Sequence, residues 1–139
     1  MEKLVGDASV IVKWFIEEEY TNEALRLRDM HVNGEILLTA PELLPFEVLN
    51  ALKYSGLFEK EELKSAAISL SNYRIELHTL KGALAEKTAE IAADENITIY
   101  DASYVALATI LKTKMYTADE KLVEKLSQKY SVYHISQTL

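Results

Sequence analysis

The residues in this sequence with the clearest chemical potential are acidic, and most stand where a helical pattern begins. Asp7 follows a short apolar run at residues 3–6, and Asp119 follows another such run. Asp101 precedes a run of small residues with helical character, and Glu47 lies inside a helical pattern. Clustered carboxylates repel one another, so a cluster of this kind implies a bound cation. All-oxygen ligands favour hard ions, Mg²⁺ or Mn²⁺, over Zn²⁺.

Three of these acids also have a structural interpretation as helix caps. Aspartate is among the residues preferred at the position before a helix, and Asp7, Asp101 and Asp119 all occupy helix starts. For Asp7 both interpretations remain open. Glu47 has no capping duty, because it lies within its helix on a face away from the apolar stripe of Leu44, Val48, Ala51 and Leu52. Glu47 is therefore the residue that favours a carboxylate cluster over three unrelated caps.

Hydroxyl side chains stand close to two of the acids in the sequence. Ser9 comes two residues after Asp7, and Thr117 comes two residues before Asp119. Hydrogen bonds from such neighbours orient the carboxylates that bind metal ions. We therefore predict that Ser9 and Thr117 support the acidic site.

Alternating extended and helical patterns supply the framework for these residues. Short β-compatible runs predict strands at residues 3–6, 36–39, 75–80, 114–117 and 132–135. Helical periodicity fills the segments between them, apart from a connector expected at residues 97–99. Strands separated by helices imply right-handed crossovers and a mainly parallel sheet of about four to five strands, covered on both faces. The carboxyl ends of parallel strands share one edge, where open α/β sheets bind ligands, so we expect the acids to converge there.

Length and composition restrict the class of protein. A chain of 139 residues is long enough to bury a substantial core, and we expect one domain over residues 1–139. The absence of cysteine excludes disulfides, thiolate catalysis and cysteine zinc sites. No signal-peptide pattern and no apolar run of roughly 18 residues is present, so we expect a cytoplasmic protein with no membrane partner. A net charge of −7 argues against a broad basic face for nucleic acid, although metal ions would bring positive charge to a phosphate.

Other classes that use acids at a sheet edge require motifs that this chain lacks. A phospho-acceptor domain is expected to carry adjacent acids after its first strand, but Asp7 is followed by Ala8 and Ser9. An aspartyl-nucleophile phosphatase requires Asp-x-Asp there, and a nucleotide-binding P-loop requires a glycine-rich turn. The histidines have no metal-ligand spacing, and we interpret all three as incidental surface residues: His31, His78 and His134.

Four segments together resemble the PIN-domain family, and within it the VapC toxins of toxin-antitoxin pairs. They are GDAS at residues 6–9, PELLPFEVLNAL at 41–52, YDASYVALA at 100–108 and TAD at 117–119. Each segment alone is a weak signal, but their order and spacing from residue 4 to about residue 123 are specific. The resemblance implies a three-layer α/β/α fold and an endoribonuclease that uses Mg²⁺ or Mn²⁺.

The resemblance also implies residue roles and partners. The acidic metal site would consist of Asp7, Glu47, Asp101 and Asp119, supported by Ser9, Thr117 and Asn50. The partners would be an RNA substrate, a second copy in a homodimer, and a VapB-type antitoxin that lays an apolar segment into a groove and blocks the site. The alternative is a PIN domain that binds RNA or protein without cleaving, because intact acids are necessary for cleavage and not sufficient.

Aromatic residues near the acids have two interpretations. The four closest in sequence are Trp14, Phe15, Tyr100 and Tyr104. Aromatic rings stack on nucleic-acid bases, but they also fill cores and interfaces, and we favour core and dimer contacts here. Apolar residues around Trp14, Leu25 and residues 44–58 exceed what one sheet face can cover. This excess predicts an exposed groove or dimer patch.

Overall fold

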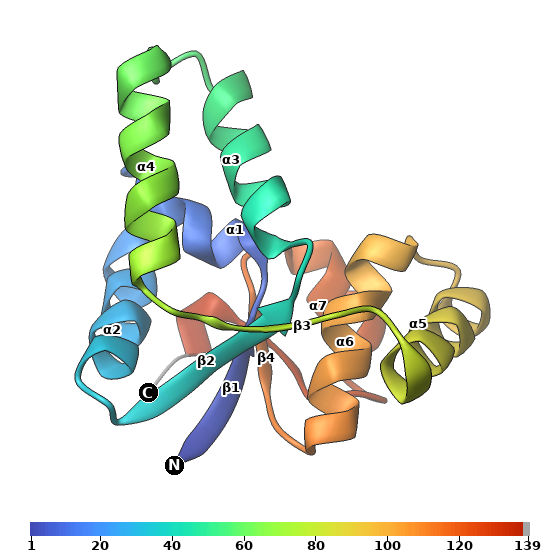
Figure 1. The fold of residues 1–139 in the computed structure, drawn as a ribbon. Coiled ribbons are helices and arrows are strands. Elements are labelled where there is room, and N and C mark those ends of the chain that lie inside the picture. Colours follow the sequence, from blue (N-terminus) through green and yellow to red (C-terminus); the bar gives the residue numbers. More distant parts are fainter. Residues whose placement is uncertain (138–139) are drawn as a thin grey trace.

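The computed structural model describes residues 1–137 and has a five-stranded sheet at its centre (Figure 1). The strands lie in the order β3-β2-β1-β4-β5, and every neighbouring pair is parallel. Their bounds are β1 Glu2–Gly6, β2 Ile36–Pro41, β3 Glu76–His78, β4 Met115–Thr117 and β5 Val132–His134. The predicted parallel sheet is confirmed. Its third strand is shorter than the strand predicted from the alternating pattern at residues 75–80.

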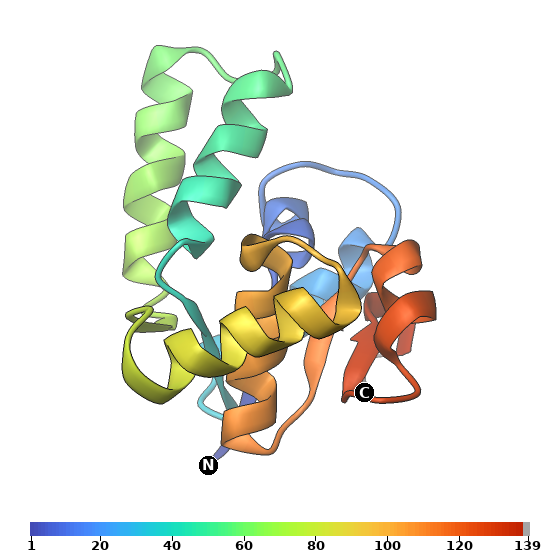
Figure 2. The ribbon, with the colours of Figure 1, turned by 90° about the vertical axis from the view of Figure 1, so that its right-hand side faces the viewer.

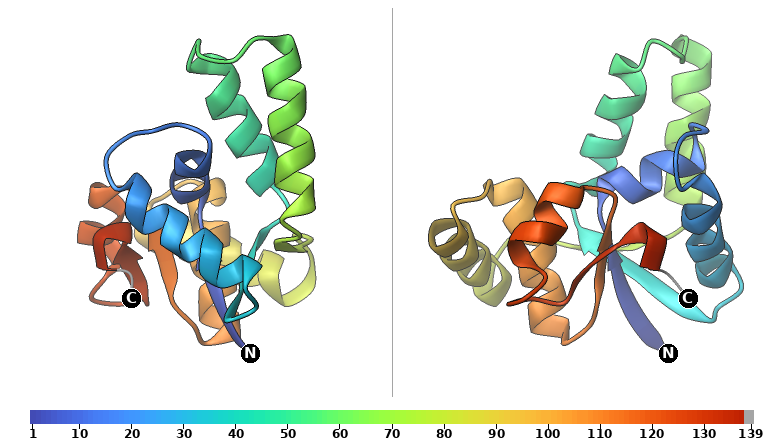
Figure 3. Two further views of the ribbon diagram at one scale, coloured as in Figure 1. Left: turned by 90° about the vertical axis from the view of Figure 1, so that its left-hand side faces the viewer. Right: turned by 180° about the vertical axis from the view of Figure 1, so that it is seen from behind.

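Helices connect the strands and form the two outer layers. The α-helices are α1 Ala8–Ile11, α2 Thr21–Val32, α3 Leu44–Tyr54, α4 Lys60–Asn72, α5 Gly82–Glu95, α6 Ile99–Leu111 and α7 Glu120–Leu126. Two 3₁₀ helices are η1 Val12–Trp14 and η2 Ile135–Gln137. Figure 2 shows α5 and α6 over one face of the sheet, and Figure 3 shows α2 over the other. The predicted three-layer α/β/α architecture is therefore confirmed.

Helices α3 and α4 stand off the sheet as a hairpin, which we call the α3–α4 arm (Figure 1). The turn between them contains Gly56 at φ +75°, a left-handed conformation that favours glycine. Pro45 lies in the first turn of α3, where a missing amide proton costs nothing. The arm therefore begins at the carboxyl edge of β2 and extends beyond the sheet.

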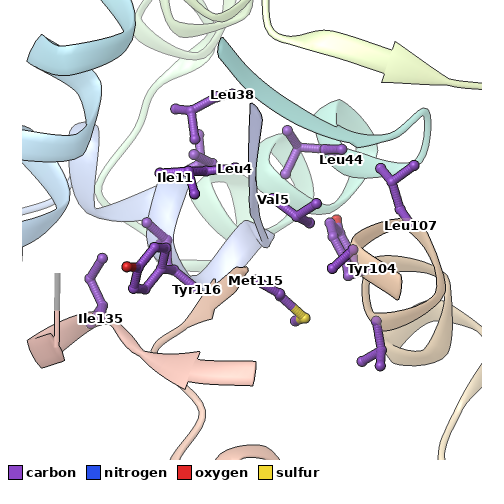
Figure 4. Close-up of a cluster of buried hydrophobic side chains, with 14 of the residues drawn as sticks. Leu4, Val5, Ile11, Leu38, Leu44, Tyr104, Leu107, Met115, Tyr116 and Ile135 are labelled. Atoms are coloured by element: carbon purple, nitrogen blue, oxygen red, sulfur yellow. The ribbon is translucent and has the colours of Figure 1, made fainter. Parts of the chain in front are cut away.

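Small residues let α6 pack closely on the sheet. Residues 102–108 of this helix are all buried, and Ala102 and Ala106 are fully enclosed. Figure 4 shows the side chains of this core, including Val5 of β1, Leu107 of α6 and Met115 of β4. No helix in residues 1–137 combines the length and apolar character needed to cross a membrane.

The structure corrects three local predictions. Asp101 does not cap a helix, because Thr98 is the cap of α6 and its hydroxyl accepts the Asp101 amide at 3.0 Å. Ala51 is exposed rather than part of a buried stripe, because α3 carries it away from the core. His134 is buried rather than a surface residue, since it belongs to β5 and its ring meets Tyr20 edge-on.

His31 is also structural rather than incidental, because it fastens α2 to the sheet. Its Nδ1 accepts a hydrogen bond from the Leu38 amide of β2 at 3.0 Å. Its Nε2 lies 2.6 Å from the carbonyl oxygen of Tyr73. Together these contacts require a neutral ring with its proton on Nε2. Sequence spacing carries no sign of this role, because both partners belong to other elements.

Candidate active site

The candidate site lies at the carboxyl edge of the sheet, between β1 and β4. The chain leaves β1 toward β2 on one side and later returns to place β4 on the other side. Ligands of open α/β sheets bind where neighbouring strands diverge in this way. Asp7 follows β1 directly, and its amide donates to the Tyr116 carbonyl oxygen at 3.2 Å. Thr117 ends β4, so the first and last of the four motifs meet at this edge.

Asp7 has the environment of a functional carboxylate rather than a cap. It occupies the position before α1, but its side chain makes no capping hydrogen bond. It is only 7% exposed, and burial raises the pKa of its carboxyl from 3.8 to about 6. Three influences lower the pKa of Asp7 in part: the hydroxyls of Ser9 and Thr117 and the backbone amide of Val10. The charge of Asp101 raises it further. A cap needs no such burial, so the local geometry favours the functional interpretation.

Ser9 and Thr117 join the loops that follow β1 and β4. Ser9 Oγ donates to Asp7 Oδ1 at 2.5 Å and accepts from the Ala118 amide at 2.8 Å. The hydroxyl oxygens of Ser9 and Thr117 are 3.3 Å apart. Thr117 Oγ1 also accepts the Asp119 amide at 3.1 Å. The two hydroxyls that were predicted to support the site thus connect Asp7 to the segment carrying Asp119.

Asp119 is a helix cap, as the local pattern suggested. Its Oδ1 accepts the amides of Lys121 and Leu122 at 3.0 and 3.2 Å, at the start of α7. Its charge also raises the pKa of Asp101. Asp119 therefore caps a helix and contributes to the electrostatic environment of Asp101.

Glu47 and Asp101 approach the edge from α3 and α6. Partial burial raises the pKa of both carboxyls, and the charge of Asp101 raises that of Glu47 further. Asp101 thus interacts with Asp7, Glu47 and Asp119, which makes it the electrostatic centre of the four. Within residues 1–137, no three acidic or histidine side chains are already arranged as a metal site. Like charges hold carboxylates apart, and a cation is what would draw these together.

Tyr104 is a residue of this site that sequence reasoning interpreted only as a core or dimer contact. Its ring is in the core, as predicted, with 2% of the residue exposed. Its hydroxyl, however, donates to Glu47 Oε1 at 2.6 Å. The one available signal was general: a buried tyrosine needs a partner for its hydroxyl. That signal does not say which partner.

An open hollow of about 470 Å³ lies beside Glu47, and its lining residues are Leu43, Phe46, Glu47, Asn50 and Tyr100. Asn50 is thereby brought beside Glu47. Phe46 is 79% exposed and Tyr100 is 62% exposed. A core role for Tyr100 is therefore wrong, because the first turn of α6 presents it to solvent, while its role as a dimer contact stays a prediction. Trp14 is a core residue as predicted, and its Nε1 donates to the Ala24 carbonyl oxygen at 2.9 Å.

Comparison with known proteins identifies the family of this chain. The family model for the PIN domain matches residues 4–126. Ribonuclease VapC3 from Pyrobaculum aerophilum is 33% identical over 128 residues, covering 88% of this chain and 94% of that protein. Ribonuclease VapC1 from Mycobacterium tuberculosis is 37% identical over 125 residues, covering 88% of this chain and 90% of that protein.

Solved structures agree at the level of the fold. A toxin-antitoxin complex from Klebsiella pneumoniae includes a chain that aligns with a TM-score of 0.68 and 12% identity. The alignment covers 95% of this chain and 97% of that chain. From the family match over most of its length and from the two ribonuclease VapC relatives, this chain belongs to the PIN domain family and is similar to its VapC members.

Proposed function

We propose that this protein is a metal-dependent endoribonuclease, the toxin of a VapBC-type toxin-antitoxin pair. The observation that carries the proposal is Asp7, a buried carboxylate at the β1–β4 edge whose pKa is raised to about 6 and whose charge interacts with Asp101. Burying a charge at a sheet edge where ligands bind is unfavourable unless a partner neutralises it. The relatives named ribonuclease VapC support RNA as the substrate.

The donor set fits Mg²⁺ or Mn²⁺. The proposed ligands are Asp7, Glu47, Asp101 and Asp119, all of them oxygen donors, and the chain has no cysteine. Hard cations prefer oxygen ligands of this kind. A cation would also compensate the two causes that raise the pKa values of Asp7, Glu47 and Asp101, which are burial first and then the charge of a neighbouring acid.

The protein's own contribution is to orient these ligands and to hold the RNA. The chemistry that Mg²⁺ or Mn²⁺ supplies when bound is activation of a water molecule and neutralisation of charge on the cleaved phosphodiester. Ser9 fixes Asp7, and Thr117 holds the segment of Asp119 against Ser9. Asn50 and Tyr100 border the hollow beside Glu47, where the RNA strand would lie and where an exposed ring is available to stack on a base.

We further propose a homodimer and a VapB-type antitoxin that uses the exposed apolar surface of the α3–α4 arm. That surface is formed by Phe46, Tyr54, Leu57 and Ile68, each at least 63% exposed. It differs from the predicted patch, because Trp14 is buried and Ile68 of α4, outside the predicted residues, is exposed. Exposed apolar patches mark interaction sites, and the fold shared with a toxin-antitoxin complex supports an antitoxin partner. Phe46 also lines the hollow, so a partner on the arm would obstruct the site.

The test is cleavage of a fluorescent single-stranded RNA pool with Mg²⁺, with Mn²⁺ and with EDTA. We expect cleavage with either ion and none with EDTA. Asp101→Asn removes the central charge and should abolish cleavage, while the Asp101 amide still bonds to Thr98. Glu120→Gln is the matched control, because it neutralises an exposed acid next to Asp119 and should leave cleavage unchanged.

Three results would contradict the proposal. Cleavage that persists in EDTA would remove the metal from the reaction, and stronger activity with Zn²⁺ than with Mn²⁺ would contradict an all-oxygen site. RNA binding without cleavage under every condition would indicate the non-catalytic alternative.

A further inference from the structure

A buried tyrosine of α6 contacts a proposed metal ligand that lies 57 residues earlier in the sequence. The Tyr104 hydroxyl donates to Glu47 Oε1 at 2.6 Å. The tyrosine ring lies among core side chains beside Val5 and Leu107 (Figure 4). Glu47 is less buried, and its helix belongs to the arm that stands off the sheet. This hydrogen bond therefore links a core residue of α6 to the α3–α4 arm.

The Tyr104 hydroxyl also lies within the field of three of the four acids. Burial is the largest influence that raises the pKa of Tyr104, followed by Glu47 and then by the charges of Asp7 and Asp101. A phenol is protonated at neutral pH, so the Tyr104 hydroxyl is the hydrogen-bond donor and the Glu47 carboxylate is the acceptor.

Glutamate needs such an anchor more than aspartate does. Its side chain has one more rotatable bond than that of aspartate and a terminal torsion that is equally broad, so an unanchored Glu47 carboxylate would rotate. A hydrogen bond to an ionised oxygen is short and about twice as strong as a neutral one. With Oε1 engaged by the phenol, Oε2 would remain available as a ligand atom for a cation.

We propose that Tyr104 is a positioning residue for Glu47, whose carboxylate it holds in place beside Asp101 so that α3 presents a ready-oriented metal ligand. This inference rests on the proposed function, because it treats Glu47 as a ligand. The alternative is that Glu47 merely satisfies a buried hydroxyl, with no effect on metal binding.

The test compares two tyrosine variants that each lose one hydrogen bond to a glutamate. Tyr104→Phe keeps the buried ring and removes the hydroxyl. Tyr130→Phe is the matched control, because the Tyr130 hydroxyl donates to Glu95 Oε2 at 3.1 Å and the acids that raise its pKa are Glu95, Asp94 and Glu90, none of them a proposed ligand. Both variants are melted in EDTA and in a series of Mn²⁺ concentrations, and the half-saturating Mn²⁺ concentration is read from the rise in melting temperature.

We expect Tyr104→Phe to need about tenfold more Mn²⁺ than the parent for the same stabilisation, the lower end of the range for losing a partner that orients a ligand. Tyr130→Phe should match the parent in Mn²⁺ requirement even where its melting temperature in EDTA is lower. In a Glu47→Gln background, Tyr104→Phe should have no further effect on the Mn²⁺ requirement. Cleavage by Tyr104→Phe should fall through kcat at low Mn²⁺ and recover when Mn²⁺ is raised.

The inference is overturned if Tyr104→Phe needs no more Mn²⁺ than the parent, or if its effect is equally large in the Glu47→Gln background. Should Tyr104→Phe fail to fold, Glu47→Asp decides, because it keeps the charge but withdraws the carboxylate from the phenol. A parental Mn²⁺ requirement in Glu47→Asp would overturn the inference. A parent that Mn²⁺ does not stabilise overturns the proposed function and this inference together, whereas a stabilised parent with an unaffected Tyr104→Phe overturns this inference alone.

Discussion

Replacing Asp7 with asparagine separates the two roles that an aspartate before a helix can have. Asparagine caps a helix about as well as aspartate, so a pure cap would tolerate the change. The structure predicts a different result, because the pKa of Asp7 is raised from 3.8 to about 6 by burial. That shift corresponds to about 3 kcal/mol by which ionised Asp7 weakens folding at pH 7. The hydrogen bonds from Ser9 and Thr117 are already contained in that shift, but the buried amide group that Asp7→Asn introduces would need partners for its N–H donors, which would offset about 1 kcal/mol of the gain.

In EDTA at pH 7, Asp7→Asn should therefore be more stable than the parent by about 1–2 kcal/mol. For a chain of this length, that is a rise in melting temperature of roughly 3–8 °C. Because the folded pKa lies above the unfolded one, folding takes up a proton between these values, and the parent loses stability as pH rises from about 4 to 6. The gap between variant and parent should widen over that window and stay constant above it.

Mg²⁺ should reverse the order of stability. A ligand that binds only the folded state adds about 2.7 kcal/mol at a hundredfold excess over its dissociation constant, and the parent should gain this amount. Asp7→Asn should gain much less, while Glu120→Gln should gain as much as the parent. Equal stabilisation of Asp7→Asn and the parent by Mg²⁺ would refute Asp7 as a ligand. A variant less stable than the parent in EDTA at pH 7 would refute the reasoning from burial.

Three further outcomes follow from the same contacts. Thr98→Ala should lower the free energy of unfolding by about 1 kcal/mol, because Thr98 rather than Asp101 caps α6. Chemical denaturation of Thr98→Ala and of the control Thr98→Ser measures this loss, and an alanine variant as stable as the parent would contradict it. His31→Gln should destabilise the protein by about 1–3 kcal/mol through two lost hydrogen bonds and leave stabilisation by Mg²⁺ unchanged, which melting with and without the ion measures. Leu57 is exposed on the arm, so Leu57→Lys should shift a dimer toward monomer in light scattering without lowering the melting temperature of the monomer. A parent protein that is strictly monomeric at micromolar concentration would rule out the dimer.

The sequence alone was sufficient to place most of the elements and to predict that the acids share one edge of the sheet. Short apolar runs and helical periodicity are local signals, and they located all five strands to within a few residues. Parallel strands align their carboxyl ends, so Asp7 and Thr117 were expected at one edge of the sheet, whereas the pairing of β1 with β4 that brings them together was seen only in the structure. Motif order then indicated the PIN-domain family before any contact was known.

The burial, the hydrogen bonds and the neighbouring charges of each acid depend on the tertiary structure. Asp7 and Asp119 both follow a strand and precede a helix, yet Asp119 caps its helix and Asp7 does not. The difference arises from packing, because Asp7 is buried against Ser9 while Asp119 remains exposed. Neighbours in the chain determine whether a helix starts, but burial and the charge of Asp101 depend on segments far away in sequence.

The hydrogen bond between Tyr104 and Glu47 shows the same limit most clearly. The prediction of core contacts for the aromatic residues was correct for Tyr104, and helical periodicity correctly placed Glu47 away from the apolar stripe of α3. Neither pattern could pair them, because side-chain partners across 57 residues depend on how α3 and α6 pack around β1 and β2. Local sequence determined the elements and their faces, whereas long-range packing determined which polar groups meet and how strongly their charges are held.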